Sequence, residues 1–259
     1  MGIVVIRNRG IGEPVPGPML SAVTNLLPES WTRRENTEWV AQYGPAGLNA
    51  VKLPFLDAVD RGAAGLVAMV HEAMIQGHRA VLLGYSGGAV VVHRALERMS
   101  DTELAQVAAV GFISDPEQPR GLPNTRGRFG IRGGTPLPVP MAARWAYDPD
   151  DGICLCPDPS PLRSAAQWSA DIGLGSPLAW EIQLRRFITL RRVPAYVFNV
   201  WDLQGEIARW AEAKRLLEGY LGKDHVSYAT RKEPGTSRTY VQNMATWLQG
   251  TVETATRPR

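Results

Sequence analysis

The stretch that decides the fold is Leu82-Leu83-Gly84-Tyr85-Ser86-Gly87-Gly88-Ala89, a Gly-x-Ser-x-Gly pattern that directly follows a short apolar run. Residues 79–84 are too few and too apolar for anything but a strand buried on both faces, and residues 87–99 are predicted to form a helix. Small residues at 84 and 88 let strand and helix approach closely around a strained serine. The pattern is typical of a nucleophilic serine, although a glycine-rich turn with an incidental serine is the alternative.

Working outward, short apolar runs alternate with helical patterns along the chain. Predicted strands cover 3–7, 107–113 and 141–147, and predicted helices cover 20–27, 62–76 and 239–248. A proline-rich loop is expected over 116–140. Alternating strands and helices indicate an α/β fold with a mostly parallel central sheet covered on both faces. We expect one domain over residues 1–259.

The pattern changes over 157–222, where we predict a helical insertion between the later strands and the last helix. One amphipathic stripe holds Trp180 and Phe187, and another holds Trp210 and Leu217. The large aromatic side chains suggest a groove for a long acyl chain, with ordinary packing onto the sheet as an equal alternative. We therefore treat Trp180, Phe187 and Trp210 as candidate substrate-binding residues.

Composition excludes several classes of protein. Hydrophobic residues make up 44% and charged residues 20%, which are ordinary globular values, and a net charge of +3 is too small to indicate a nucleic-acid partner. No apolar run approaches the length of a membrane span, and the start of the chain does not resemble a signal peptide, so we expect synthesis in a cytoplasm. Cys154 and Cys156 are too close in sequence for a disulfide, and free thiols are expected.

A nucleophilic serine needs a histidine base, and the only histidine after Ser86 is His225, in an expected loop. The α/β-hydrolase order Ser, Asp, His places an acid between them. Residue types alone leave four candidates open: Asp115, Asp148, Asp150 and Asp151. The earlier histidines show no metal-ligand spacing, so neither a metal nor another cofactor is expected. A Gly10-x-Gly12 turn lacks the third glycine and the helix of a dinucleotide site.

Four segments together resemble the motifs of cutinase-like serine esterases in order and spacing. They are Arg9–Pro14, Gly84–Gly88, Pro149–Cys154 and His225–Tyr228. The resemblance implies an α/β-hydrolase fold with a catalytic triad of Ser86, His225 and Asp151, the aspartate three residues before a cysteine. It also implies an oxyanion hole made by the backbone N–H groups of Ile11 and Gly87, and it makes Tyr85 a candidate substrate contact. Ile11 replaces the usual hydroxyl residue, which leaves only backbone donors.

Within that family, the chain is most similar to phage lysin B proteins, because of the 111–116 strand end and the long insertion. That likeness implies hydrolysis of the mycolic acid ester to arabinogalactan in a mycobacterial-type envelope, after host lysis or from a virion. Two alternatives remain open at this point. One is a virion-associated protein that binds the envelope with little or no turnover, and the other is an intracellular small-ester hydrolase or acyltransferase.

Overall fold

Five parallel strands form the central sheet of the protein. The structure, a computed structural model, describes residues 2–43, 53–169 and 196–256. The sheet order is β2-β1-β3-β4-β5, and all four strand pairs are parallel. The strands are β1 (Ile3–Asn8), β2 (Thr32–Glu35), β3 (Arg79–Tyr85), β4 (Val107–Ile113) and β5 (Ala143–Ala146). This confirms the predicted α/β fold with a parallel sheet.

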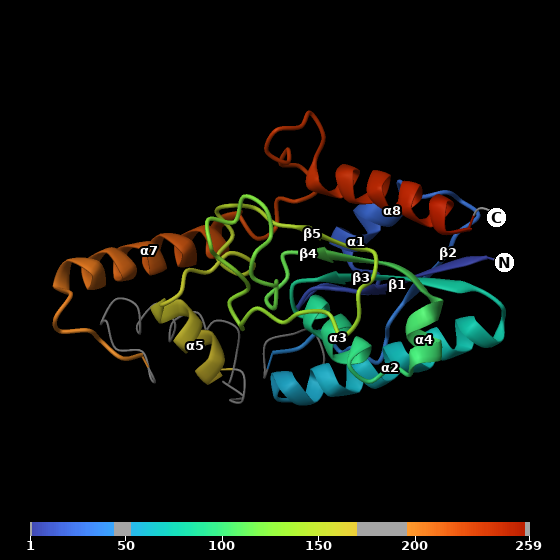
Figure 1. Ribbon diagram of the computed structural model, residues 1–259, viewed down its shortest axis with the longest axis horizontal. Helices are drawn as coiled ribbons and strands as arrows, with labels where there is room; N and C mark the ends of the chain where they lie inside the picture. Colours follow the sequence, from blue (N-terminus) through green and yellow to red (C-terminus); the bar gives the residue numbers. More distant parts are fainter. Residues whose placement is uncertain (1, 44–52, 170–195, 257–259) are drawn as a thin grey trace.

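Helices cover both faces of the sheet (Figure 1). On one face lie α2 (Phe55–Ile75), α3 (Gly87–Leu96) and the short α4 (Asp101–Gln106). The other face packs against α1 (Pro18–Thr24) and α8 (Tyr240–Thr256). Each face buries its own apolar cluster, so β1, β3 and β4 are apolar on both sides, as their continuous hydrophobic runs predicted.

The predicted elements are correct in type, and their ends differ for identifiable reasons. Helix α2 begins seven residues earlier than predicted, directly after Pro54, because Phe55, Ala58 and Val59 continue its buried face. It ends before Gly77, whose positive φ of 70° stops the helix as predicted. Strand β2 was not predicted, because its sequence, Thr-Arg-Arg-Glu, has no alternation of apolar and polar residues. Charged residues are common in a strand at the edge of a sheet, where β2 lies.

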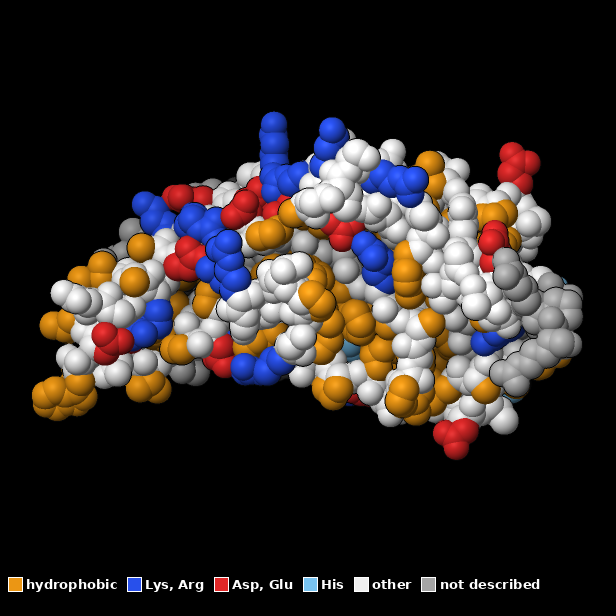
Figure 2. Space-filling model, turned by 45° about the horizontal axis from the view of Figure 1, so that its top comes forward, with side chains coloured by type: hydrophobic (Ala, Val, Ile, Leu, Met, Phe, Trp, Pro, Cys, Tyr) orange, Lys and Arg blue, Asp and Glu red, His pale blue; other side chains and the backbone are white. Residues whose placement is uncertain are grey.

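The 157–222 segment contributes two described helices, α5 (Pro161–Ser169) and α7 (Leu203–Gly222). They pack on each other through a third apolar cluster, separate from the two that cover the sheet. The stripe predicted over 203–217 is helical, but its first turns are exposed: Leu203 and Ile207 are more than half exposed. Exposed hydrophobic side chains gather at that end of the molecule in Figure 2. Trp180 and Phe187 lie outside the described residues.

Candidate active site

The carboxyl ends of four neighbouring strands supply most of the site. The segments that follow β1, β3, β4 and β5 carry Ile11, Ser86, Ser114 and Asp151 respectively. Because the strands are parallel and adjacent, these segments meet at one edge of the sheet. His225 reaches the same edge from the loop between α7 and α8.

Ser86 lies at the turn between β3 and α3 with a φ of 52° and a ψ of −123°, a strained conformation for a residue with a side chain. Its N–H donates to the Ile113 carbonyl at 3.0 Å, which ties the turn to β4. A Cβ atom at Gly88 would lie 1.9 Å from the Asn8 carbonyl oxygen. The helix can therefore approach β1 only because residue 88 is glycine, as the sequence pattern predicted.

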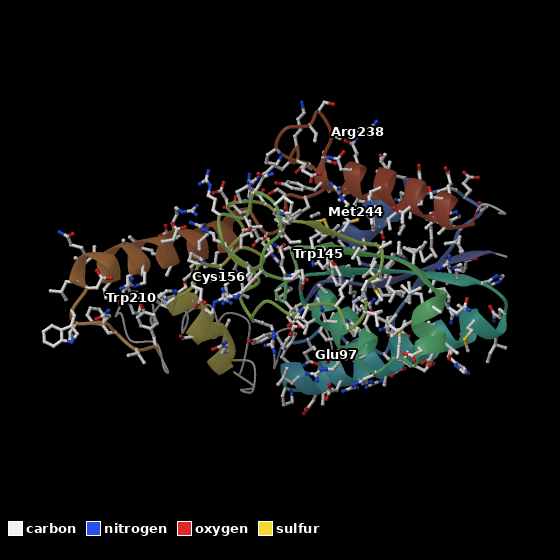
Figure 3. The ribbon with its side chains drawn as sticks, in the orientation of Figure 1. Glu97, Trp145, Cys156, Trp210, Arg238 and Met244 are labelled. Carbon is white, nitrogen blue, oxygen red and sulfur yellow. The ribbon has the colours of Figure 1, made fainter. Side chains whose placement is uncertain are left out.

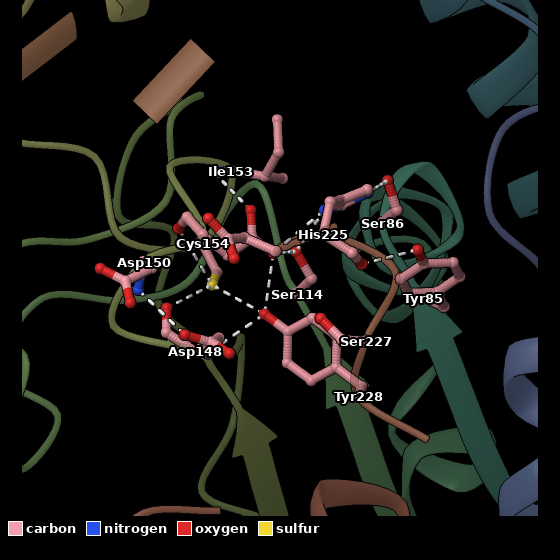
Figure 4. Close-up of polar contacts among 12 residues, drawn as sticks. Tyr85, Ser86, Ser114, Asp148, Asp150, Ile153, Cys154, His225, Ser227 and Tyr228 are labelled. Atoms are coloured by element: carbon pink, nitrogen blue, oxygen red, sulfur yellow. Dashed lines mark hydrogen bonds and ion pairs between the residues drawn. The ribbon is translucent and has the colours of Figure 1, made fainter. Parts of the chain in front are cut away.

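Ser86, His225 and Asp151 form a continuous hydrogen-bonded chain (Figure 4). His225 Nε2 lies 2.9 Å from Ser86 Oγ, and His225 Nδ1 lies 3.0 Å from Asp151 Oδ2. With the imidazole proton on Nδ1, the ring donates to the carboxylate and its Nε2 accepts from the serine hydroxyl. This geometry lets His225 act as a base toward Ser86 while Asp151 fixes the ring.

Asp151 is fully buried and is nevertheless held as a carboxylate. Burial alone raises the pKa of Asp151, but the positive charge of His225 and hydrogen bonds from His225, Ser114 and the Ile153 N–H outweigh it, so the net pKa is lowered. The side chain thus stays charged beside the imidazole, as stabilising an imidazolium requires.

The other three acid candidates are occupied elsewhere. Asp115 contacts His93, with His93 Nε2 2.8 Å from its Oδ2. Asp148 accepts from Arg231 at 2.6 Å, and Asp150 accepts from Arg215 at 3.0 Å. Of the four aspartates that the residue types left open, Asp151 alone contacts His225 within the described part of the chain.

Ile11 and Gly87, the two residues expected to form the oxyanion hole, lie next to each other, and Gly87 directly follows Ser86. In the part of the chain that the structure describes, neither the Ile11 nor the Gly87 N–H donates a hydrogen bond. A Cβ atom on Gly87 would lie 2.7 Å from Ile11 Cγ1, so the two residues are in contact. Free N–H groups at a helix N-terminus and an adjacent loop are suited to bind an oxyanion.

Glu13 shapes the loop that carries Ile11, and sequence analysis missed this role. Its two carboxylate oxygens accept from the Gly10 N–H at 2.7 Å and the Met19 N–H at 3.0 Å. Burial raises the pKa of Glu13. The Gly12 N–H donates to the Ala41 carbonyl at 3.0 Å. The N–H groups on either side of Ile11 are thus used, and that of Ile11 is left free. The sequence did contain a signal for this role, because Glu13 follows Gly10 by three residues in a proline-rich turn.

An apolar cavity of about 130 Å³ opens at Ser86. Its wall includes Leu216, Leu217 and Tyr220 of α7, so the insertion borders the site as predicted. Its other lining residues come from the strand-end loops, α2, α3 and α5: Ile11, Tyr43, Phe55, Gly87, Pro116, Ile131, Arg132, Gly152, Ile153, Leu162 and Ala166.

Two candidate substrate contacts need correction. Tyr85 packs behind His225, with ring centroids 5.3 Å apart and its hydroxyl donating to the His225 carbonyl at 2.9 Å, so it supports the histidine. Trp210 is 3% exposed and packs within the α5–α7 cluster (Figure 3). Neither residue lines the cavity. Trp210 serves core packing, a use for which large aromatic side chains are as well suited as for a groove.

The remaining sequence predictions concern metals, cysteines and the membrane. The residues described here contain no group of three or more potential metal ligands. Cys154 and Cys156 are both buried free thiols. None of the described helices is long and apolar enough to cross a membrane.

This site and sheet define the class of the protein. A serine on a strained strand-to-helix turn, hydrogen-bonded to a histidine that a buried aspartate holds, on a parallel sheet covered by helices, is the arrangement of α/β-hydrolase enzymes. Residues 2–160 match the family model described as Cutinase, and the chain belongs to that family. The protein is a serine carboxylic ester hydrolase.

Several solved structures are similar to this chain. A cutinase-like protein from Cryptococcus sp. is 20% identical, with a TM-score of 0.46 over 71% of this chain and 94% of that one. The catalytic core domain of acetyl xylan esterase from Trichoderma reesei is also 20% identical, with a TM-score of 0.48 over 64% of this chain and 92% of that one. A search of curated proteins gave no match.

Proposed function

We propose that the protein hydrolyses lipid esters through an acyl-enzyme formed on Ser86. His225 takes the serine proton as Ser86 Oγ attacks the ester carbonyl, and it returns that proton to the leaving alcohol. Asp151 holds the ring and stabilises the imidazolium. The N–H groups of Ile11 and Gly87 bind the oxyanion. Water then attacks the acyl-enzyme, with His225 again as base, and releases the acid.

The observation that carries this proposal is the apolar cavity that begins at the nucleophile. In another protein an apolar cavity of roughly 150 Å³ binds benzene, so a cavity of this size accommodates an acyl segment of about six carbon atoms. Among the described residues that line it, Arg132 is the one with a formal charge. An aliphatic acyl group suits such a wall better than a polar one does.

We further propose mycolyl-arabinogalactan as the specific substrate. The similarity of the 111–116 strand end and the long insertion to phage lysin B proteins supports this narrower assignment, and an apolar acyl cavity is consistent with it. The proposed place of action is the cell envelope, after lysis or from a virion. An enzyme that releases no mycolic acid from purified arabinogalactan ester, yet cleaves soluble butyrate esters, would be a small-ester hydrolase instead.

Filling the cavity tests the general proposal. Leu217→Trp places a larger side chain in the cavity wall and should reduce kcat/KM for octanoate esters by roughly tenfold more than for acetate esters, because only the longer chain uses the remote contact. The matched control is Leu203→Trp on the exposed end of the same helix, which should leave the ratio unchanged. Both variants must melt cooperatively. Equal losses on the two esters in Leu217→Trp would show that this cavity does not bind the acyl chain.

A further inference from the structure

Asp151 receives more hydrogen bonds than a catalytic triad requires. Its Oδ2 accepts from the Ser114 hydroxyl, from the Tyr228 hydroxyl at 2.8 Å and from His225 Nδ1 at 3.0 Å. Its Oδ1 accepts from the Ile153 N–H at 3.0 Å. Only one of these four donors belongs to the triad. The other donors satisfy a carboxylate that water does not reach.

Ser114 sits between the acid and the base. Its Oγ is also 3.0 Å from His225 Nδ1, and because its single proton goes to Asp151, its oxygen can only accept from the ring N–H. Its backbone has a positive φ of 47°, which is strained for a residue with a side chain. The Ser114 N–H donates to the Ala146 carbonyl at 2.9 Å, which holds this conformation between β4 and β5.

Tyr228 donates to the same carboxylate oxygen as Ser114, and its other polar contacts can be followed in Figure 4. Its hydroxyl donates to Asp151 and accepts from the Asp148 N–H at 3.1 Å, so its direction is fixed. The Cys154 sulfur lies 3.4 Å from that hydroxyl. Burial and the charge of Asp151 raise the pKa of Tyr228 well above its ordinary value, which keeps the hydroxyl a donor.

We propose that Ser114 and Tyr228 are positioning residues of the catalytic unit, which aim Asp151 at His225 and limit the negative charge that its Oδ2 presents to the imidazolium. Each hydrogen bond donated to Oδ2 spreads its charge, so the carboxylate stabilises the imidazolium less than a carboxylate without these donors would. The proposal rests on the proposed function, in which His225 is that base.

Other titratable groups also face this unit. Glu13 acts on His225 electrostatically, and the rings of Tyr85 and Tyr220 lie 5.3 and 5.0 Å from its ring. Asp148 and Cys154 contact Tyr228, and Arg231 pairs with Asp148. None of these side chains is replaced in the variants below, although Tyr228→Phe also removes the hydroxyl that the Asp148 N–H and Cys154 contact.

The decisive pair of variants is Tyr228→Phe and Tyr240→Phe. The two rings are in contact, with centroids 5.0 Å apart, and both side chains are buried, but the Tyr240 hydroxyl has no hydrogen-bond partner among the described residues. Tyr228→Phe should move the rising limb of kcat/KM against pH upward by roughly half a pH unit and lower kcat by roughly fivefold. Tyr240→Phe should move neither.

A spectroscopic readout separates this inference from the proposed function. The Nδ1 proton of His225 should give a low-field proton NMR signal, assigned by its loss in His225→Gln, and its titration midpoint should rise in Tyr228→Phe whether or not an ester is cleaved. An unmoved midpoint in Tyr228→Phe, or an equal movement in Tyr240→Phe, overturns the inference. Absence of ester hydrolysis by the wild type would overturn the proposed function alone.

Ser114→Gly supplies the second variant, in case Tyr228→Phe fails to fold. Glycine adopts the positive φ without strain, and this gain offsets part of the stability that is lost with the hydroxyl donor to buried Asp151, so we expect the variant to fold with at most a modestly lower thermal midpoint. We expect kcat to fall roughly tenfold with KM unchanged, because the lost contact orients the triad and does not touch the ester. Wild-type kcat in a stable Ser114→Gly protein would show that Ser114 does not position the unit.

Discussion

Two buried histidine–aspartate pairs lie in the described part of the protein, and there one of them contacts a nucleophile and the other does not. His225 and Asp151 are joined at 3.0 Å, and His93 and Asp115 at 2.8 Å. All four side chains are at most 8% exposed. Each aspartate follows a strand of the same sheet, and each histidine comes from a different element. By distance and burial alone, the two pairs cannot be told apart.

The difference lies in what surrounds each imidazole. The second nitrogen of His225 reaches Ser86, and the cavity opens at that serine. His93 lies in α3, where its ring stacks on Phe112 with centroids 4.7 Å apart, and the same Asp115 oxygen also accepts from Trp145 Nε1 at 2.9 Å. In the described chain, no nucleophilic side chain contacts His93. A buried acid–base pair therefore becomes catalytic only when its free nitrogen meets a nucleophile at an open cavity.

The largest effect should come from removing the nucleophile or the base of the first pair. Ser86→Ala and His225→Ala should each lower kcat on p-nitrophenyl esters by roughly 10⁴-fold or more, and the double variant should be little worse, because the residues act as one unit. His93→Gln should retain activity within about threefold of wild type. Multiplicative losses in the double variant would contradict a shared step, and a comparable loss in His93→Gln would erase the contrast between the pairs.

The second largest effect should be the difference in kcat between variants of Asp151 and Asp115. Asp151→Asn should lower kcat by roughly 10³-fold to 10⁴-fold, because an amide cannot hold the required tautomer or stabilise the imidazolium. Asp115→Asn should act mainly on stability, because it leaves His93 and Trp145 with a poorer acceptor in a buried site. Steady-state kinetics beside thermal melts check both variants. If Asp115→Asn were the more damaging to kcat in a protein that still folds, Asp151 would not be the acid.

Sequence patterns predicted the parts of the site that local chemistry requires. Ser86 and its flanking glycines are recognisable because the sharp turn imposes residue types, and His225 because it is the only histidine after them. The acid was different. Asp115 and Asp151 both follow strands, and only three-dimensional packing shows that the first faces His93 and the second faces His225. Motif resemblance selected Asp151, the aspartate that contacts His225, where residue types left four candidates open.

The supporting residues were beyond sequence reasoning for a similar reason. Ser114 and Tyr228 act across 37 and 77 residues of chain, respectively, on Asp151, and no local pattern encodes such contacts. The missed helix α4 is another matter. Its Ser100–Glu103 capping box was visible in the sequence and marks its start. The long-range contacts of Ser114 and Tyr228 become visible only in the folded structure. The capping box, in contrast, is a local signal that could have predicted the start of α4.

The smallest predicted effect concerns the second pair and stability against pH. Burial lowers the pKa of His93, but the charge and hydrogen bond of Asp115, aided by Glu117 and Glu97, outweigh it, so the net pKa is raised. A histidine whose pKa is higher in the folded than in the unfolded protein stabilises the fold fully below its ordinary value of about 6.5. That contribution is lost as the pH rises through the raised value.

The thermal midpoint of the wild type should therefore fall by a few degrees as the pH rises from about 6 to about 9, because the charged His93–Asp115 pair becomes neutral on the histidine side. His93→Gln removes the titrating ring, and this variant should show a flatter dependence over the same range. Ser86→Ala is the matched control, since it leaves both pairs in place and should keep the wild-type slope. A slope as steep in His93→Gln as in the wild type would mean that His93 is not charged in the folded protein. The pair would then be a neutral hydrogen bond in the core, and the contrast with His225 would rest on geometry alone.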